Sequence, residues 1–543
     1  MRTKFFPSKN LKMNTTTQIP KLSAKYIGEP LDIYEQVRCG RSANTLLLES
    51  ADLTTHAGRQ SLIIADSALR ISCRGLKVTL EALTENGAAT FPLLRNELAS
   101  GPATASENAA AGTLEFTFPP IDATTDEESR LRAHSPLDVL RAVRKVCTPE
   151  NEPERVLIGG IFGYDLIEVF EKLPAVEESA NTCPDFLFYL AETLITIDHV
   201  EHTTTISTLS VSDSATETAR LTARAAELQR ACENFVAPAE KSTAPNAGTP
   251  TDALTETLPL TLGKSDKTYG AEVEYLKAFI RKGDIFQVVP SRCFSVPCPV
   301  PEAAYRVLKR NNPSPYMFYV DDREFVVFGA SPEISVKFTA ATRRVELYPI
   351  AGTRKRGFNP DGTINLDLDS RVEFDLRMDS KELSEHLMLV DLARNDLARI
   401  AKPNTRHTSE LLKVDRYSHV MHLVSHVVAE LRDELDALHA YLACMNMGTL
   451  TGAPKIRATE LLREVERKRR GSYGGAVGYL SGNGDMDTCI LIRSAFVKDG
   501  TATVQAGGGV VLDSVPQSEA DESRNKAMAT LVAIAQSQGK KLG

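Results

Sequence analysis

Apolar and polar residues alternate over short distances in the first half of the chain, a pattern that predicts β-strands separated by polar turns. Ser61–Ala65 and Leu194–His199 follow this pattern. Ala215–Phe235 instead spaces its apolar residues three or four positions apart, as on one face of a helix. The chain from residue 237 onward is rich in Ala, Pro, Thr and Glu and shows neither period, so we expect a linker or surface loop over residues 237–264.

Beyond residue 265 the pattern predicts a mixture of helices and strands. Gly283 suits a helix end because glycine adopts the left-handed conformation easily. Asp379, with Glu382 three residues later, resembles a capping box at a helix start. Helices are predicted over Tyr269–Lys282 and Ser380–Asn395 and from Pro516 onward. Strands are predicted over Asp284–Phe294, Tyr316–Val320, Phe325–Ala330, Ile334–Phe338, Arg344–Pro349, His419–Ala429, Gly474–Ser481, Cys489–Val497 and Thr501–Gly507.

These elements lack the regular alternation of strand and helix that a parallel sheet requires. We therefore predict an α+β fold with large antiparallel sheets and flanking helices. The expected organisation is a disordered tail over residues 1–18, an N-terminal region over 19–236, the loop over 237–264 and a C-terminal region over 265–543. We expect the N-terminal region to fold against the C-terminal region as one body.

Composition excludes several classes of function. The 543 residues carry a net charge of −8, which argues against non-specific binding of nucleic acid. No apolar run is long enough to span a bilayer, so no membrane partner is expected. The nine cysteines include no CxxC pair, which excludes a simple zinc motif and favours a reducing, cytoplasmic setting. The absence of tryptophan leaves the chain without indole fluorescence.

Two pairs of glutamates have the spacing of one helical turn. Glu382 and Glu385 form the first pair, and Glu519 and Glu522 form the second. Residues three apart share a helix face, so two such helices could bring four carboxylates together around a Mg²⁺ ion. Each pair also lies near a helix start, where an acidic residue is favoured anyway. The spacing by itself leaves both interpretations open.

The glycine run Gly507–Gly509 follows a predicted strand and precedes the second glutamate pair. Glycine allows backbone N–H groups to approach an anion closely, but the run matches neither a P-loop nor a dinucleotide motif. A tight turn or bulge explains it equally well. Arg493 interrupts an apolar segment that reads as a strand, so its side chain either faces water or holds an anion.

Several long segments, taken in order, resemble the signature blocks of the chorismate-binding enzymes. These blocks are Pro349–Gly357, Lys381–Leu397, Gly448–Lys455 and Gln505–Val511. The resemblance spans about residues 265–530 and extends to Leu47–Ser50, which is similar to the tryptophan-sensing segment of the family's anthranilate synthases. It implies the chorismate-utilising fold, with a catalytic C-terminal region and a regulatory N-terminal region.

Two positions resemble one branch of this family. Isochorismate and salicylate synthases carry a lysine that activates water where this chain has Gln287. Without that lysine water lacks its activating base, which favours ammonia as the nucleophile. Aminodeoxychorismate synthases carry a lysine at the position of Ala351 in this chain. Anthranilate synthases resemble this chain in having alanine there. The resemblance therefore implies amination of chorismate, then loss of pyruvate to give anthranilate, the first committed step of tryptophan biosynthesis. An aminodeoxychorismate synthase and a non-catalytic tryptophan-sensing homologue remain the alternatives.

The resemblance also assigns roles to residues. It implies that Glu385 and Glu522 hold Mg²⁺, with Glu382 and Glu519 close by or acting through water, and that Glu333 is the acid for the departing hydroxyl. The implied catalytic set is Glu333, His422, Thr449 and Gln287. The implied substrate-binding set is Gly352, Thr353, Tyr473, Arg493, Gly507, Gly508 and Gly509.

No glutaminase motif is visible in the chain, so the resemblance implies ammonia supplied by a separate glutamine amidotransferase subunit in a hetero-oligomer, expected as a heterotetramer. Feedback inhibition by L-tryptophan is implied as well. The implied tryptophan pocket consists of Glu49, Ser50, Asn312, Pro315, Tyr316, Met317, Phe318 and Cys489.

Overall fold

The computed structural model describes residues 19–38, 43–49, 60–122, 124–236, 256–416 and 420–543. The predicted tail therefore lies outside the described residues, as does most of the predicted loop over 237–264. The described part of that loop, residues 256–264, contains two short strands, one paired near the C-terminus and one at the edge of the main sheet. Among the described residues no helix is long and apolar enough to cross a membrane.

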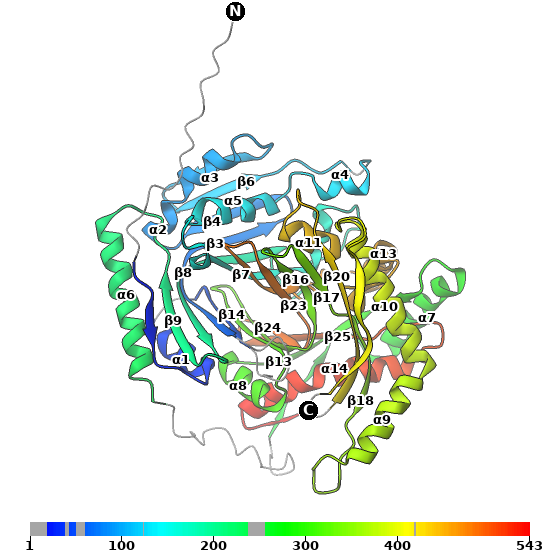
Figure 1. The fold of residues 1–543 in the computed structure, drawn as a ribbon. Helices are drawn as coiled ribbons and strands as arrows, with labels where there is room; N and C mark the ends of the chain where they lie inside the picture. The colour runs from blue at the N-terminus through cyan, green and yellow to red at the C-terminus, as the bar shows by residue number, and fades with distance from the viewer. Residues whose placement is uncertain (1–18, 39–42, 50–59, 123, 237–255, 417–419) are drawn as a thin grey trace, which may run out of the picture.

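The helices cover the outside of the sheets, and Figure 1 shows α7, α8 and α14 on one side and α9 and α10 along another. The α-helices are α1 (Pro30–Arg38), α2 (Glu85–Ala88), α3 (Phe91–Leu98), α4 (Glu127–Leu131), α5 (Leu137–Cys147), α6 (Ala215–Glu233), α7 (Asp266–Lys282), α8 (Pro301–Asn311), α9 (Leu366–Met378), α10 (Ser380–Ala398), α11 (Ala437–Cys444), α12 (Gly448–Thr451), α13 (Lys455–Glu466) and α14 (Pro516–Ser537). Two 3₁₀ turns are η1 (Pro153–Arg155) and η2 (Tyr164–Val169).

The strands form one branched antiparallel network, apart from two small two-stranded sheets. The strands of the first half are β1 (Leu22–Ala24), β2 (Thr45–Glu49), β3 (Gln60–Arg74), β4 (Lys77–Ala82), β5 (Thr104–Asn108), β6 (Thr113–Thr117), β7 (Leu157–Phe162), β8 (Phe186–Asp198) and β9 (Thr203–Thr208). Those of the second half are β10 (Thr257–Leu258), β11 (Thr261–Leu262), β12 (Gln287–Val288), β13 (Ser291–Pro297), β14 (Tyr316–Asp321), β15 (Val326–Ser331), β16 (Ile334–Thr339), β17 (Arg344–Leu347), β18 (Ile350–Lys355), β19 (His407–Arg416), β20 (Val420–Glu430), β21 (Gly452–Ala453), β22 (Ala476–Ser481), β23 (Met486–Ile490), β24 (Ser494–Lys498), β25 (Thr501–Gly507) and β26 (Lys541–Leu542). The predicted α+β class with antiparallel sheets is confirmed.

Strands of the two halves pair directly with each other. In the antiparallel register of β2 with β14, Glu49 lies opposite Met317. Likewise β7 pairs with β22 along its whole length. A buried ion pair between Arg70 and Asp322, with N–O distances of 2.7 and 3.0 Å, reinforces the same junction. The N-terminal half is therefore part of the sheet network that carries the C-terminal half.

Local signals in the sequence set several helix ends as expected. Ser265 caps α7 by accepting the Thr268 N–H, and Gly283 ends that helix at a φ of 81°, which glycine adopts without strain. Asp379 caps α10 by accepting the N–H groups of Lys381 and Glu382. The reciprocal half of the predicted capping box is wrong, because the Glu382 carboxylate pairs with an arginine instead.

Two predicted strands are broken in the structure. Asp284–Phe294 divides into β12 and β13 at Pro290, which has no N–H to donate to a ladder. Cys489–Val497 divides into β23 and β24, and the break contains Arg493 at a φ of 51°. A left-handed residue interrupts the regular ladder, and β23 ends before Arg493 while β24 begins after it, so Arg493 is a corner residue rather than a strand residue.

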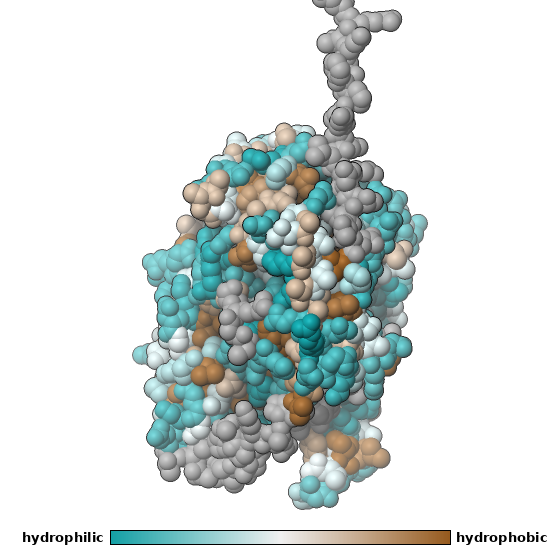
Figure 2. Space-filling model, turned by 90° about the vertical axis from the view of Figure 1, so that its left-hand side faces the viewer, coloured by the Kyte–Doolittle hydropathy of each residue, from teal (hydrophilic) through white to brown (hydrophobic). Residues whose placement is uncertain are grey.

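Hydrophilic and apolar residues are interspersed on the surface. On the face drawn in Figure 2, apolar residues form small separate patches among hydrophilic ones. Eight of the nine cysteines lie among the described residues and are unpaired, seven of them buried. This agrees with the absence of a disulfide framework in the sequence.

Candidate active site

The glycine run lies where three elements converge. Gly507 ends β25 opposite Ser291 of β13, and the next two glycines lead toward α14. A Cβ atom on Gly508 would lie 2.6 Å from Glu519 Oε2, and one on Gly509 would lie 2.2 Å from Gln287 Nε2 and 3.3 Å from Glu385 Oε1. Neither glycine has a positive φ, and a Cβ atom at either position would displace the ends of these side chains, so the run leaves room for them to lie against the backbone.

The first glutamate pair reaches this run from the N-terminal turns of α10. Glu385 Oε1 accepts a hydrogen bond from Gln287 Nε2 at 3.2 Å. Burial raises the pKa of Glu385, and the negative charge of Glu382 raises it further. Glu382 itself pairs with Arg354 at 2.8 Å, and its Oε2 would lie 3.3 Å from a Cβ atom on Gly352.

The second pair reaches the run from the first turns of α14. Glu519 is 5% exposed, burial raises its pKa, and its Oε2 has no hydrogen-bond partner among the described residues. Glu522 differs because its Oε1 lies 2.6 Å from Lys526 Nζ, one helical turn further on. Lys526 also donates to the carbonyl oxygen of Gly507 at 3.1 Å.

Carboxylates of both pairs thus lie against one glycine run, Glu519 and Glu522 at Gly508 and Glu385 at Gly509, without closing into a finished site. No group of three or more His, Cys, Asp or Glu side chains in the described ranges is gathered closely enough to hold a metal ion. The i,i+4 spacing of Glu522 and Lys526 is a signal that sequence reasoning missed.

A second centre forms around Glu333, between β15 and β16. Its Oε1 accepts a hydrogen bond from Thr449 Oγ1 at 2.9 Å, which joins this carboxyl to α12. Burial, with only 6% of the residue exposed, raises its pKa to about 7, although Thr449 and the positive charge of Arg493 oppose the shift. Glu333 can therefore hold or release a proton near neutral pH.

Arg493 lies among the other predicted polar residues. Burial lowers its pKa, and its positive charge acts on Glu333 and on His422. Burial, followed by the charge of Arg493, lowers the pKa of His422 to about 4, so its imidazole is neutral at neutral pH. His422 Nδ1 lies 2.8 Å from Thr353 Oγ1. Tyr473 is buried, and burial raises the pKa of its hydroxyl while the positive charges of Arg470 and Arg493 oppose the shift.

The residues of the predicted tryptophan pocket lie along β14 and its neighbours, except Ser50, which lies outside the described residues. Glu49 is buried opposite Met317, and its carboxylate accepts hydrogen bonds from Tyr305 at 2.6 Å and from Lys309 at 2.7 Å. Neither Tyr305 nor Lys309 was identified from the sequence, because no local pattern links α8 to β2.

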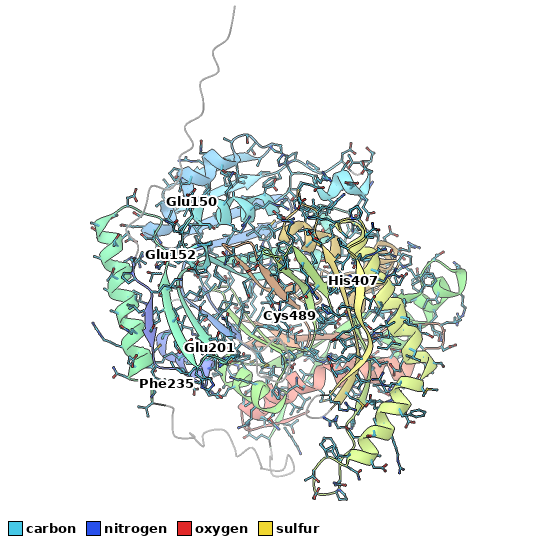
Figure 3. The ribbon with its side chains drawn as sticks, in the orientation of Figure 1. Glu150, Glu152, Glu201, Phe235, His407 and Cys489 are labelled. Atoms are coloured by element: carbon cyan, nitrogen blue, oxygen red, sulfur yellow. The ribbon has the colours of Figure 1, made fainter. Side chains whose placement is uncertain are left out.

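The remaining pocket residues cluster around β14. Tyr316 donates a hydrogen bond to Asp487 at 3.0 Å, which ties β14 to β23. Cys489, on the same strand as Asp487, pairs in register with Ile334 and lies in the interior between the sheets (Figure 3). Phe318 is buried on β14, whereas Asn312 ends α8 and Pro315 directly precedes β14.

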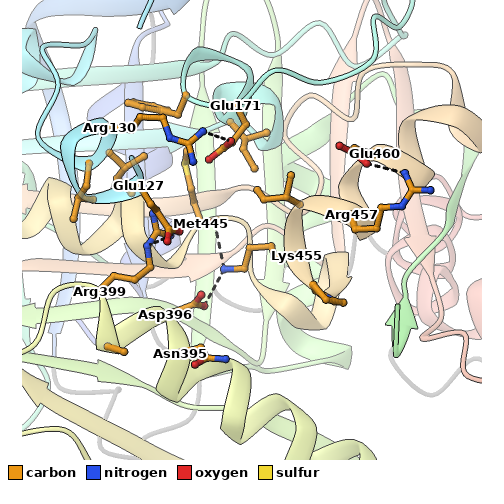
Figure 4. Close-up of a pocket in the computed structure, with 17 residues that line it drawn as sticks. Glu127, Arg130, Glu171, Asn395, Asp396, Arg399, Met445, Lys455, Arg457 and Glu460 are labelled. Atoms are coloured by element: carbon orange, nitrogen blue, oxygen red, sulfur yellow. Dashed lines mark hydrogen bonds and ion pairs between the residues drawn. The ribbon is translucent and has the colours of Figure 1, made fainter. Parts of the chain in front are cut away.

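A separate cavity of about 700 Å³ lies between the C-terminal end of α10, the start of α13, α4 and η2 (Figure 4). Inside it, Lys455 Nζ lies 2.8 Å from Asp396 Oδ2 and 2.8 Å from the carbonyl oxygen of Cys444. Its rim carries further ion pairs, including Arg130 with Glu171 at 2.8 Å. None of the described residues lining it belongs to the predicted site.

Comparisons with known proteins agree with this geometry. The family described as chorismate binding enzyme matches residues 101–532. Anthranilate synthase component 1 of Salmonella typhimurium is 53% identical over 521 residues, covering 96% of this chain and 97% of that protein. Its Escherichia coli counterpart is 52% identical, with the same coverage.

The chain also aligns over most of its length with solved structures of chorismate-utilising enzymes. Anthranilate synthase component I from Streptococcus pneumoniae aligns with a TM-score of 0.66 at 28% identity, covering 88% of this chain and 93% of that one. A menaquinone-specific isochorismate synthase from Escherichia coli aligns with a TM-score of 0.62 at 16% identity, covering 95% and 94% of the two chains. At that identity the second likeness concerns the fold alone.

Proposed function

The chain belongs to the chorismate binding enzyme family, and on that premise we propose that it converts chorismate and ammonia into anthranilate and pyruvate, as the large subunit of an anthranilate synthase. The reaction is that of a lyase in the tryptophan pathway. Identity above 50% over nearly the full length of two anthranilate synthase components is the observation that carries this proposal.

Gln287 supports a nitrogen nucleophile. Its amide donates to Glu385 at 3.2 Å, so it lies at the edge of the glycine run. An amide nitrogen has no basic lone pair at neutral pH and cannot deprotonate water, whereas ammonia needs no such base. Amination by ammonia is therefore favoured over hydration at this position.

The four glutamates fit a hard divalent cation. Glu519 Oε2 is buried without a hydrogen-bond partner among the described residues, and the Glu385 carboxyl is destabilised as an anion by burial and by Glu382. Oxygen donors of this kind suit Mg²⁺, which we assign to Glu385 and Glu522 directly, with Glu382 and Glu519 in support. When bound, Mg²⁺ would neutralise the ring carboxylate of chorismate and act as a Lewis acid.

The protein's own groups then supply proton transfer. Glu333, with its pKa near 7, is protonated in a large fraction of molecules at neutral pH and can donate to the C4 hydroxyl as it leaves. Thr449 holds the carboxyl in place through its hydrogen bond. His422, neutral at this pH, can accept or donate one hydrogen bond beside Thr353 without adding charge.

Binding of the enolpyruvyl end is assigned to Arg493 and the residues around it. A buried guanidinium destabilised by its surroundings gains from an incoming carboxylate, which supplies the missing counter-charge. Tyr473 and the amides of the glycine run can donate further hydrogen bonds to the same group. Gly352 and Thr353 would border the ring.

One assay tests the activity. The purified chain, given chorismate, Mg²⁺ and ammonium, is expected to form anthranilate, measured by its fluorescence, together with an equal amount of pyruvate. Formation of an aminated product without pyruvate would instead identify an aminodeoxychorismate synthase. No product at all would refute the proposal.

Ammonia supply by a glutamine amidotransferase subunit is part of the same proposal. Glutamine is expected to be inert with the isolated chain and to become a nitrogen donor once a partner subunit is added. Such a pair would form a hetero-oligomer, expected as a heterotetramer. Activity with glutamine in the absence of any partner would contradict this part.

Regulation by tryptophan can be measured directly, because the chain contains no tryptophan of its own. Added L-tryptophan is expected to show an emission shift on a dark background as its indole enters the pocket beside β14. Ser50→Phe should abolish the shift and leave turnover intact, whereas Ser50→Ala should keep both. Loss of turnover along with the shift would contradict a separate regulatory site.

A further inference from the structure

Lys526 is a cation bound to one of the proposed metal ligands, at the border of the glycine run. Its ammonium nitrogen lies 2.6 Å from Glu522 Oε1 and 3.1 Å from the carbonyl oxygen of Gly507. It therefore bridges the second glutamate pair and the glycine run, the two features that border the site.

The charge of Lys526 reaches beyond its direct partner. It lowers the pKa of Glu385 and of Glu519, each of which burial raises. It acts in the same direction on Glu333. One ammonium group thus partly neutralises carboxylates from α10, α14 and the β15–β16 turn, as a metal ion at the same place would do.

We infer that Lys526 is an internal substitute for the metal, which occupies Glu522 in the metal-free enzyme and must leave it before a divalent cation can bind. This inference rests on the proposed function, in which Glu522 is a direct ligand. Mg²⁺ lies about 2.0–2.1 Å from its oxygen ligands, so an ammonium 2.6 Å from the same oxygen stands in its way. The metal ion and the Lys526 ammonium also repel each other, and this repulsion is stronger toward the buried carboxylates Glu385 and Glu519, where water screens it less.

Two consequences follow from this exchange. Metal affinity of the free enzyme is lowered by the interaction that the lysine loses when it leaves Glu522. The metal-free fold is also stabilised, since Lys526 offsets part of the repulsion among the carboxylates around the glycine run, in addition to Arg354 and Lys381. The lysine therefore weakens metal binding and, while no metal is bound, reduces the repulsion among the carboxylates of the site.

Mn²⁺ binding to the full chain without substrate tests the inference, with free Mn²⁺ measured by its paramagnetic resonance signal. Lys526→Gln is expected to bind Mn²⁺ about ten-fold or more tightly than the wild type. Mn²⁺ should also raise its melting temperature more than that of the wild type, because ligand binding to the native state stabilises it. Lys526→Arg, which keeps the cation, should resemble the wild type in both measurements.

Lys381→Gln is the matched control, because Lys381 acts on the charge of Glu385 and Glu519 from α10. If removal of any nearby charge tightened binding, Lys381→Gln would match Lys526→Gln, and direct occupation of Glu522 would be refuted. Unchanged or weaker binding in Lys526→Gln, with binding still lost in Glu522→Gln, would overturn the inference and leave the metal site standing. Absence of Mn²⁺ binding in every variant would overturn both.

Discussion

Glu385→Gln and Glu522→Gln are each expected to lower kcat/KM by about 10³-fold, because each removes a charged oxygen ligand from the proposed Mg²⁺ site. An amide oxygen is a weaker ligand than a carboxylate oxygen and, being neutral, leaves more of the positive charge of the metal unneutralised. Glu382→Gln and Glu519→Gln should cost less, about 10- to 100-fold, as expected of groups that orient or support the ligands. Steady-state assays over a range of Mg²⁺ concentrations measure both effects.

Glu410→Gln serves as a control, since Glu410 is half exposed on β19 and pairs only loosely with Lys413 at 3.4 Å. It should leave kcat/KM unchanged. Melting temperatures of all the variants separate loss of a ligand from loss of the fold. If Glu382→Gln or Glu519→Gln proved as damaging as the other two, the division into direct and supporting residues would be wrong.

Glu333→Gln is expected to lower kcat by about 10²- to 10⁴-fold, which is the usual contribution of a general acid. In the wild type the rate should fall as the pH rises above about 7, because the acid must be protonated to act and its pKa lies near that value. The residual activity of Glu333→Gln should lack this alkaline decline. A pH–rate profile with ammonium corrected for its own ionisation measures both.

Thr449→Val provides a directional check on the same carboxyl. The Thr449 hydroxyl donates to Glu333 and thereby lowers its pKa, so removal of the hydroxyl should raise the pKa. The acid then remains protonated to higher pH, and the alkaline decline should move to higher pH. A decline that stays in place, or moves to lower pH, would show that another group controls it.

Sequence reasoning found most of the elements, because their signals are local. The helical period of Ala215–Phe235 predicts α6 almost to its last residue, and Gly283 and Asp379 mark helix ends through backbone hydrogen bonds within one turn. The breaks at Pro290 and Arg493 were missed, since the surrounding residues remain apolar and β-branched. At Pro290 the missing N–H is itself a local signal, whereas at Arg493 the left-handed backbone conformation is not visible in the sequence.

For the candidate site too, the sequence identified the residues and the tertiary structure determined their states. The residue types and spacings of the glutamate pairs, the glycine run and the ordered family blocks identified its members from the sequence alone. Only the tertiary structure decided their states: Arg493 placed at a corner between strands, Glu333 buried until its pKa approaches neutrality, and the Glu522–Lys526 pair brought against the carbonyl oxygen of Gly507. The physical reason is that spacing along the chain is fixed by covalent geometry, whereas burial and charge depend on neighbours that lie hundreds of residues away.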